Sequence, residues 1–351
     1  MGRFSSDRLF MLKRGTGQCG DWTRFRLEGK RMDDQQVEER DEACHGGPLT
    51  QDYYKDSCAN VEHIVRNVTW KYVAQDLTLA APLLRLHFHD CFFRGCDASV
   101  LLDSTPNNTA EKDAPPDLTL GGFNIIDDIK SEVEKTCPRI VSCADIVALA
   151  ARDSVPFQYK RLLWEVPLGR RDGTISLASE VIANIPAPTF NFSQLKQNFA
   201  SKSLRQPLTF LTILQGGHTI DVGHCNLFSQ RLYNFTAGKH DADPSLNSTY
   251  AAFLKTQCKS LSNKITIVPM DPGSPLSFDN NYFKNLKLNH GLFQSDSALL
   301  TNNEATNTVD ELLDYQDFFS KFGQSMKRMG AIEVLTGSSG KIRKKCNVVN
   351  S

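Results

Sequence analysis

Helical spacing of apolar residues is the feature that most limits what this chain can fold into. In most long segments apolar residues recur every three or four positions, which is typical of helices with one buried face. Strand signals are few and short, and the connections are rich in Pro, Gly, Asn and Asp. The sequence therefore predicts an all-α fold of about ten helices. The expected helices are 61–75, 80–89, 123–135, 143–152, 192–201, 244–258, 280–286, 307–313 and 316–329.

Charge and length exclude several classes of partner. The 351 residues contain 40 Lys plus Arg and 40 Asp plus Glu, so no excess of positive charge favours nucleic acid or an anionic membrane. No apolar run approaches the roughly 20 residues that a membrane-spanning helix needs. We therefore expect a soluble protein with no nucleic-acid or membrane partner.

Cysteines and glycosylation motifs together indicate a secretory route. Ten cysteines are many for a reduced cytosolic protein and favour disulfides in an oxidising compartment. Any single N-x-[ST] motif is weak evidence, but five of them beside ten cysteines agree with secretion. Each asparagine can also be a plain surface residue. The motifs begin at Asn67, Asn107, Asn191, Asn234 and Asn247.

The first 47 residues differ from the rest of the chain. They are dense in charge, and their only apolar patch is Leu9–Leu12, which is shorter than the run of about 7–15 residues in a secretory signal. No signal peptide is visible. We expect residues 1–47 to be a disordered tail that contains Cys19 and Cys44, and residues 48–351 to form the folded domain.

Two residues in the segment 80–89 form a candidate catalytic pair. Arg85 and His89 are four residues apart and share one face of a helix, with Phe88 beside them. The guanidinium lowers the pKa of the imidazole and so favours the neutral form that a proton acceptor requires. The alternative is a solvated surface Arg and His, and this segment alone does not decide between them.

A second histidine follows two glycines. His218 lies after Gly216 and Gly217, and glycine permits close approach of a flat cofactor to the backbone. The alternative is an ordinary loop histidine.

Oxygen-rich turns form two candidate calcium sites. Carboxylates, hydroxyls and carbonyls on a constrained loop suit a hard cation. The alternative is two polar turns that bind no metal. The first group is Asp90, Asp97 and Ser99 around Gly95, and the second is Asp271, Ser274, Ser277 and Asp279 with Thr219.

Long motifs in a fixed order make the chain from about Leu49 to Ser351 resemble the secreted plant peroxidases, the class III haem peroxidases. The resemblance implies ten or more helices in two lobes, roughly 48–190 (distal) and 191–330 (proximal), with haem between them. The motifs are A-P-L-L-R-L-H-F-H-D-C-F-F-R-G-C-D-A-S-V-L-L, V-S-C-A-D-I-V-A-L-A-A-R-D, G-R-R-D-G, G-G-H-T-I, F-D-N-N-Y-F, G-L-F-Q-S-D and M-K-R-M-G.

The resemblance also implies a role for single residues around one haem b. His218 matches the histidine that ligates the iron, and Asp296 matches the carboxylate behind it. His89 matches the acid–base that moves the peroxide proton, while Arg85 stabilises the departing oxygen. Phe88 would contact the cofactor. Pro186 matches a residue that meets aromatic donors at the haem edge.

Metal ligands and disulfides follow from the same resemblance. One calcium would bind Asp90, Phe93, Gly95, Asp97 and Ser99, and a second would bind Thr219, Asp271, Ser274, Ser277 and Asp279. The implied disulfides are Cys58–Cys137, Cys91–Cys96, Cys143–Cys346 and Cys225–Cys258. Spacing alone does not give this connectivity.

Several positions depart from the family pattern. Asp117 occupies the place where an asparagine usually bonds the distal histidine, and a carboxylate there favours protonated His89. Residues 160–162 lack the usual glycines and proline, Gln215 replaces a serine, and Met270 stands where other members can carry an aromatic residue. These changes leave the expected iron ligand in place.

Three functions remain open at this point. The leading one is a monomeric peroxidase, in the cell wall or vacuole, that reduces hydrogen peroxide and oxidises small phenolic donors in two one-electron steps. Roles in lignin cross-linking, peroxide removal and oxidative stress would follow from the family. The alternatives are a haem-binding protein with little turnover, which Asp117 motivates, and a structural wall glycoprotein without haem, which the glycosylation motifs motivate.

Overall fold

Helices dominate the computed structural model, which describes residues 49–202 and 207–350. Within these ranges it contains thirteen α-helices and one sheet of two short strands, which confirms the all-α prediction. The expected tail 1–47, with Cys19 and Cys44, lies outside the described residues. In the described part of the chain, no helix combines the length and apolar character needed to cross a membrane.

All nine expected helices are present, some with shifted bounds, and four further ones occur. In the first half of the chain the α-helices are α2 Val61–Val73, α3 Ala80–Phe93, α4 Phe123–Thr136, α5 Cys143–Ser154 and α6 Ala178–Asn184. In the second half they are α7 Phe192–Ala200, α8 Pro207–Leu214, α9 Cys225–Tyr233, α10 Ser248–Gln257, α11 Asn281–Lys287, α12 Gln294–Ala298, α13 Asn303–Glu311 and α14 Tyr315–Met329. The four further helices are α6, α8, α9 and α12.

Short elements connect these helices. The 3-10 helices are η1 Leu77–Leu79, η2 Ser99–Leu101, η3 Glu111–Asp113, η4 Val155–Gln158, η5 Gln215–Ile220 and η6 Leu299–Thr301. Strands β1 (Val222–His224) and β2 (Ile267–Pro269) pair antiparallel, with Gly223 opposite Val268. Of these elements, η5 matters most below because it carries His218 directly after α8.

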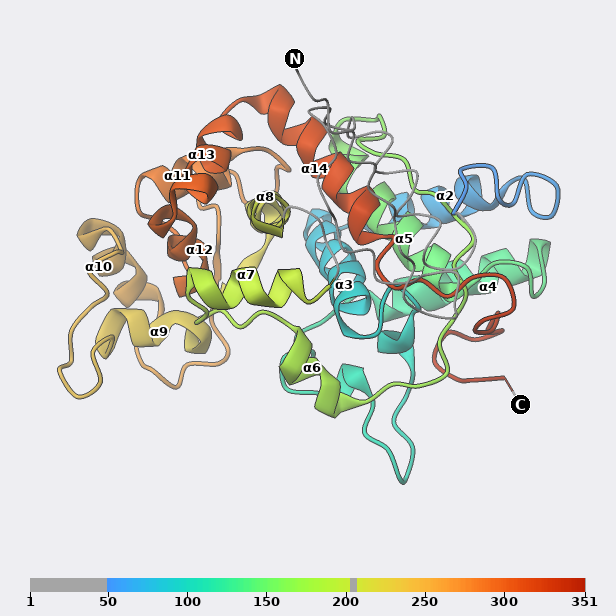
Figure 1. The fold of residues 1–351 in the computed structure, drawn as a ribbon, viewed down its shortest axis with the longest axis horizontal. Coiled ribbons are helices and arrows are strands. Elements are labelled where there is room, and N and C mark those ends of the chain that lie inside the picture. The colour runs from blue at the N-terminus through green and yellow to red at the C-terminus, as the bar shows by residue number, and fades with distance from the viewer. Residues whose placement is uncertain (1–48, 203–206, 351) are drawn as a thin grey trace, which may run out of the picture.

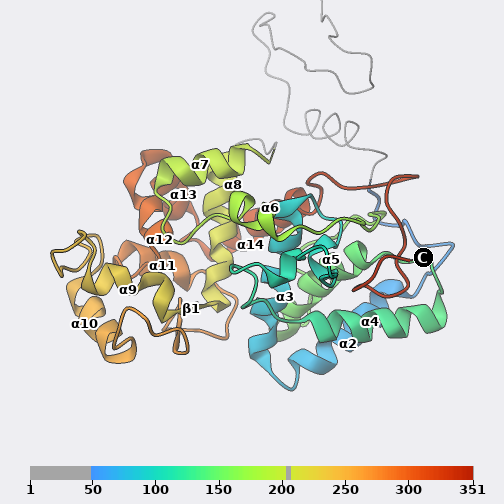
Figure 2. The ribbon, with the colours of Figure 1, turned by 90° about the horizontal axis from the view of Figure 1, so that it is seen from below.

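The helices form two groups with α14 between them (Figure 1). One group contains α2, α3, α4 and α5, and the other contains α7 to α13; the view turned by 90° shows the same separation (Figure 2). Helix α3 packs on α5 and touches η5, whereas α8 packs on α7, α13 and α14. The main apolar core includes residues of both groups. The expected lobe boundary near residue 190 therefore stays a prediction.

Among the described residues, four disulfides join segments that are distant or adjacent in the chain. The structure joins the four pairs that the family resemblance implied, which are Cys58–Cys137, Cys91–Cys96, Cys143–Cys346 and Cys225–Cys258. The Cys143–Cys346 bond spans 203 residues and ties the C-terminal segment to the start of α5. The Cys225–Cys258 bond joins the N-terminus of α9 to the residue after α10, inside a second, smaller apolar cluster.

Candidate active site

Helix α3, which contacts η5, carries an imidazole and a guanidinium one turn apart. His89 is 4% exposed, and Phe88 and Phe93 lie edge-on to its ring, with centroids 5.8 and 5.9 Å away. Arg85, one turn earlier, is half-buried. The spacing of four residues places both on one helix face, as the sequence indicated.

A buried carboxylate holds the His89 ring. Nδ1 of His89 lies 2.7 Å from Oδ1 of Asp117, and Asp117 is 1% exposed. An ionised carboxylate only accepts hydrogen bonds, so Nδ1 carries the proton and Nε2 is left as the basic nitrogen. Burial lowers the pKa of His89; the hydrogen bond from Nδ1 to Asp117 opposes this, and the charge of Arg85 adds to it. The lowering of the His89 pKa by burial therefore outweighs the raising by Asp117 that the sequence indicated.

Arg85 is anchored by the loop that carries Asp117. Its guanidinium donates to the carbonyl and hydroxyl oxygens of Thr119 at 3.2 and 3.0 Å, and to the carbonyl of Pro116 at 3.2 Å. The same loop carries Asp117, so one segment positions both polar side chains of α3. Two of these contacts are to backbone carbonyls, which have no signature in the side-chain sequence.

The second histidine has its own carboxylate. Nδ1 of His218 lies 3.1 Å from Oδ1 of Asp296, which has no exposed surface. The other oxygen of Asp296 accepts from the backbone N–H of Phe293 at 2.7 Å, and the hydroxyl of Tyr282 lies 3.0 Å from Oδ1. Burial tends to lower the pKa of His218, but the hydrogen bond and charge of Asp296 outweigh it and raise that pKa.

The two histidines lie on elements that contact each other, α3 and η5. The charges of Arg85 and Asp221 act on the pKa of both rings. A Cβ atom added at Gly217 would meet Leu84 of α3 at 3.4 Å, so the two elements face each other here. The His218 side chain is 24% exposed although Asp296 behind it is not exposed at all. An open imidazole backed by a buried carboxylate fits a haem iron ligand.

The first oxygen-rich loop contains buried oxygens without partners. Asp90, Asp97 and Ser99 are at most 4% exposed, and neither Oδ1 of Asp90 nor Oγ of Ser99 has a hydrogen-bond partner. Burial raises the pKa of Asp97 to about 6 and that of Asp90 well above its usual value, with help from the neighbouring carboxylates. Gly95 has φ +93°, and a Cβ there would lie 2.4 Å from the Glu333 carbonyl. Such a site fits a divalent cation.

One carboxylate in this loop region was missed from the sequence. Glu111 is fully buried, both of its carboxylate oxygens lack partners, and burial together with Asp90 raises its pKa to about 9. Phe93, the remaining expected ligand, ends α3, and its carbonyl lies 3.5 Å from Nζ of Lys202.

The second oxygen-rich group gathers beside His218. The Thr219 hydroxyl lies 3.2 Å from Oδ2 of Asp271 and 3.3 Å from Oδ1 of Asp279. Ser274 donates to Asp271 at 2.9 Å, and the Ser277 backbone N–H bonds the Ser274 carbonyl. Two carboxylates beside the buried hydroxyl of Thr219 also fit calcium.

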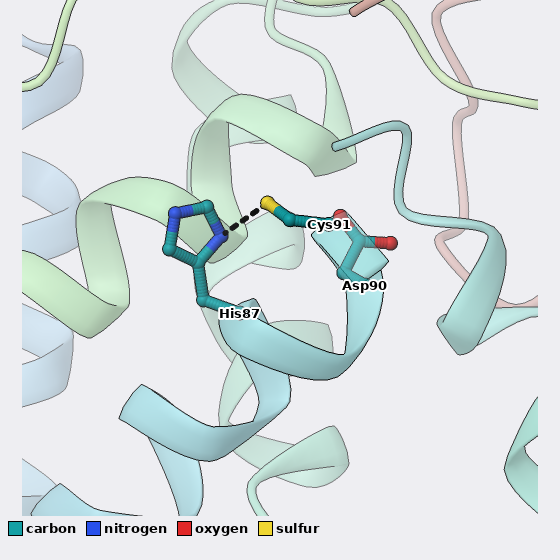
Figure 3. A group of neighbouring side chains, drawn as sticks. All are labelled: His87, Asp90 and Cys91. Atoms are coloured by element: carbon teal, nitrogen blue, oxygen red, sulfur yellow. Dashed lines mark hydrogen bonds between the residues drawn. The ribbon is translucent and has the colours of Figure 1, made fainter. Parts of the chain in front are cut away.

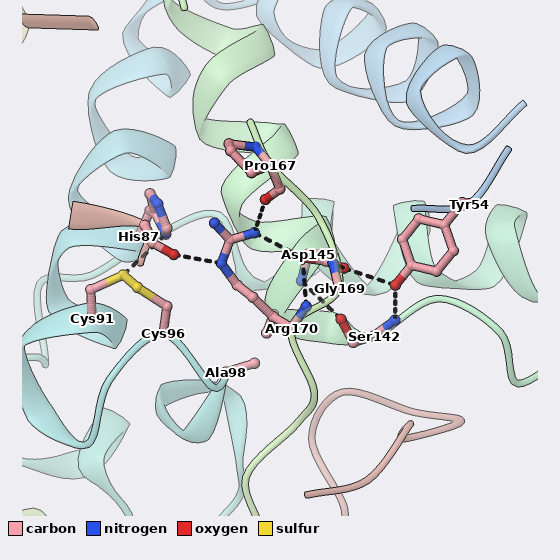
Figure 4. Close-up of polar contacts among 12 residues, drawn as sticks. Tyr54, His87, Cys91, Cys96, Ala98, Ser142, Asp145, Pro167, Gly169 and Arg170 are labelled. Carbon is pink, nitrogen blue, oxygen red and sulfur yellow. Dashed lines mark hydrogen bonds and ion pairs between the residues drawn. A yellow bond between two sulfur atoms is a disulfide. The ribbon is translucent and has the colours of Figure 1, made fainter. Parts of the chain in front are cut away.

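A third group of potential metal ligands is explained without a metal. His87, Asp90 and Cys91 lie close together on α3 (Figure 3). However, Cys91 is bonded to Cys96 and offers no thiolate. His87 faces the buried Arg170, which bonds Asp145 and the carbonyl of Gly330 (Figure 4). Burial and the charge of Arg170 lower the pKa of His87 to about 3, so this ring is neutral and structural.

Pro186 lies just beyond the end of α6 and is half-buried. Two residues later, the carbonyl of Pro188 accepts a hydrogen bond from the backbone N–H of Ser295, the neighbour of Asp296. The segment expected to meet donors is therefore attached to the helix that carries the His218 partner.

Comparison with known proteins gives one consistent result. A family model described as "Peroxidase" matches residues 65–314. Peroxidase 1 of Oryza sativa subsp. japonica is 52% identical over 307 residues, which cover 86% of this chain and 93% of the relative. Peroxidase 3 of Arabidopsis thaliana is 51% identical over 306 residues (86% and 92%), and Peroxidase 24 of the same plant is 48% identical over 310 residues (87% and 88%).

Proposed function

This chain belongs to the class III plant peroxidase family, oxidoreductases that use hydrogen peroxide, and on that premise we propose how its own residues do so. His218 binds the iron of one haem b through Nε2, and Asp296 holds the proton on Nδ1. His89 is the acid–base, Arg85 the positive charge beside it, and Phe88 a contact of the cofactor. The bound haem supplies the two-electron reduction of peroxide and the later one-electron oxidations.

His89 and Arg85 divide the proton and charge work. Nε2 of neutral His89 takes the proton from the incoming peroxide and returns it to the departing oxygen, which leaves as water. Asp117 keeps the ring in the tautomer with Nδ1 protonated. The guanidinium of Arg85, fixed by Thr119 and Pro116, stabilises negative charge on the departing oxygen.

Two calcium ions complete the proposal. One binds Asp90, Phe93, Gly95, Asp97 and Ser99, and the other binds Thr219, Asp271, Ser274, Ser277 and Asp279. The unpartnered buried oxygens of Asp90 and Ser99 support the first site. Through Asp90 and Thr219, each site lies next in the chain to one of the two histidines, so calcium would help to fix both rings.

The donors that fit are small phenols, which would meet Pro186 at the open edge. A monomer in the cell wall or vacuole, with roles in lignin cross-linking, peroxide removal and oxidative stress, follows as part of the same proposal. The four disulfides support a secretory route.

One observation carries this function: two imidazole–carboxylate pairs, one on each of the contacting elements α3 and η5. The test is to load the chain with haem and calcium and follow guaiacol oxidation and the haem Soret band. Replacement His89→Leu should keep the Soret band and lower the rate constant with peroxide by about 10²–10⁴-fold. Replacement His218→Ala should lose tight haem binding, and the exposed His63→Ala is the matched control. Peroxide-dependent activity that survives His89→Leu would refute the assignment.

A further inference from the structure

Gln215 shares a helix face with His218. Both lie on the 3-10 helix η5, in which residues three apart lie above one another. The turn is held rigidly, because a Cβ added at Gly216 would lie 2.7 Å from the ring of Phe318 and 3.1 Å from that of Phe283. The Gln215 side chain is therefore directed into the same interior as the His218 ring.

A single hydroxyl group lies between Gln215 and the carboxylate behind His218. The Tyr282 hydroxyl oxygen is 3.1 Å from Oε1 of Gln215 and 3.0 Å from Oδ1 of Asp296. The three residues are 9, 1 and 0% exposed, so water does not replace these contacts. Burial and the charge of Asp296 raise the pKa of Tyr282 well above its usual value, and the phenol keeps its proton. A phenol has one proton, so the two acceptors compete for it.

This competition affects the hydrogen bonds that Asp296 receives. Its carboxylate has three neighbouring donors, which are His218, Tyr282 and the backbone N–H of Phe293. When the hydroxyl turns toward Gln215, Asp296 loses one donor and attracts the Nδ1 proton of His218 more strongly. A more electron-rich imidazole stabilises ferric iron over ferrous iron.

We propose that Gln215 is a positioning residue that lowers the reduction potential of the iron bound at His218, by drawing the Tyr282 proton away from Asp296. The inference rests on the proposed role of His218 as iron ligand. It concerns a position where this chain departs from its family pattern, since Gln215 stands in place of a serine.

The test replaces the Gln215 carbonyl by an apolar side chain of similar length. In the haem- and calcium-loaded protein, Gln215→Met should shift the Fe(III)/Fe(II) midpoint potential in the positive direction. It should also lower the frequency of the ferrous iron–histidine stretching band. In a Tyr282→Phe background the same replacement should produce no shift, because the contested proton is gone. The exposed Gln230→Met is the matched control.

The outcomes separate this inference from the function on which it rests. An iron–histidine band that is present in the unaltered protein and lost in His218→Ala supports the axial ligand; its absence in the unaltered protein refutes that ligand. With the band present, an unchanged or more negative potential in Gln215→Met overturns the role of Gln215, as does an equal shift in the Tyr282→Phe background. If Gln215→Met does not bind haem, Gln215→Leu provides the same comparison.

Discussion

At the residue scale, the pKa values of the two histidines shift in opposite directions, although each ring is paired with a buried carboxylate. At His218 the nearby Asp296 outweighs burial and raises the pKa, whereas at His89 burial outweighs Asp117 and lowers it. An iron ligand benefits from a firmly held Nδ1 proton, while a base must keep Nε2 free. The charge of Asp117 thus opposes the shift that a proton acceptor at His89 needs.

The replacement Asp117→Asn should therefore accelerate the reaction with peroxide on the acid side of its pH profile. An amide oxygen still accepts the hydrogen bond from Nδ1 but removes the negative charge that favours the imidazolium form. The pKa of His89 falls, and the acid limb of the rate profile moves to lower pH. Below the original limb the rate should rise about tenfold for each unit of that movement. Stopped-flow measurement of the second-order rate constant between pH 4 and 8 checks this.

The replacement Asp117→Leu distinguishes charge from hydrogen bonding. It removes the acceptor as well as the charge and leaves a buried N–H of His89 without a partner. We expect a slower reaction than in the unaltered chain, in contrast to Asp117→Asn. If both variants react alike, the hydrogen bond does not orient the ring.

At the element scale, two neighbouring glycines of η5 should tolerate a methyl group very differently. A Cβ at Gly216 would lie 2.7 Å from the Phe318 ring, so Gly216→Ala forces the helix away from α14. A Cβ at Gly217 would make only an ordinary contact, with Leu84 at 3.4 Å. In the haem-free protein, Gly216→Ala should lower the free energy of unfolding by about 1–3 kcal/mol. Gly217→Ala should change it little.

Thermal or urea unfolding of the two variants beside the unaltered chain measures this difference. A destabilisation of equal size in both would show that loss of glycine, and not the packing against Phe318, sets the cost. Gly217 also borders the space proposed for haem, so the comparison is made without the cofactor.

A long helix with a clear apolar stripe was predictable from sequence, whereas a helix without a helical period was not. Helix α4 was expected at 123–135 and spans Phe123–Thr136, because Ile125, Ile129 and Val133 mark a single buried face. Helix α8 reads P-L-T-F-L-T-I-L, which is apolar on nearly every side and shows no helical period. Helix α12 has five residues, too few for any period. The expected start of α10 at residue 244 was wrong, since Asn247 caps the helix at Ser248.

Some parts of the site were likewise predictable from sequence, and others were not. The pair Arg85 and His89 followed from helix spacing, but nothing in the spacing joins His218 to Asp296, which is 78 residues away. The family resemblance implied that pair. Neither the helix spacing nor the family resemblance predicted the buried Glu111 or the contact between Gln215 and Tyr282. Tertiary packing alone brings such residues together.

At the scale of the whole molecule, buried carboxyl groups gather where distant parts of the chain meet. Asp90 lies in the last turn of α3, Asp97 precedes η2 and Glu111 begins η3. Arg343 of the C-terminal segment donates to the carbonyl of Ala98 at 2.6 Å. Burial raises the pKa of Asp97 to about 6 and that of Glu111 to about 9. Ionising these groups in the folded state costs free energy unless a cation compensates.

Removing calcium should therefore destabilise the protein, and more strongly at neutral pH than in acid. A ligand that binds only the folded state adds about 2.7 kcal/mol per site at a hundred times its Kd. Because the folded pKa of Asp97 lies above its unfolded value, the metal-free protein binds more protons when folded between about pH 4 and 6. Its stability therefore rises as the pH falls through that range. The stability lost on calcium removal should be greatest above pH 6 and should become smaller toward pH 4.

Differential scanning calorimetry measures both effects on calcium-loaded protein and on protein that was freed of calcium with EGTA at pH 7 and then desalted, each at pH 7 and pH 4.5. The unfolding temperature should fall on chelation at pH 7 and return when calcium, but not magnesium, is restored, because Mg²⁺ is too small for such a loop. The variant Asp97→Asn should lose the part of the calcium response that belongs to the first site, since it removes a charge that the cation compensates, and should keep the part that belongs to the second. If the unfolding temperature at pH 7 does not change on calcium removal, Arg343 alone compensates the charge of these carboxylates. The loop between α3 and η2 then needs no metal.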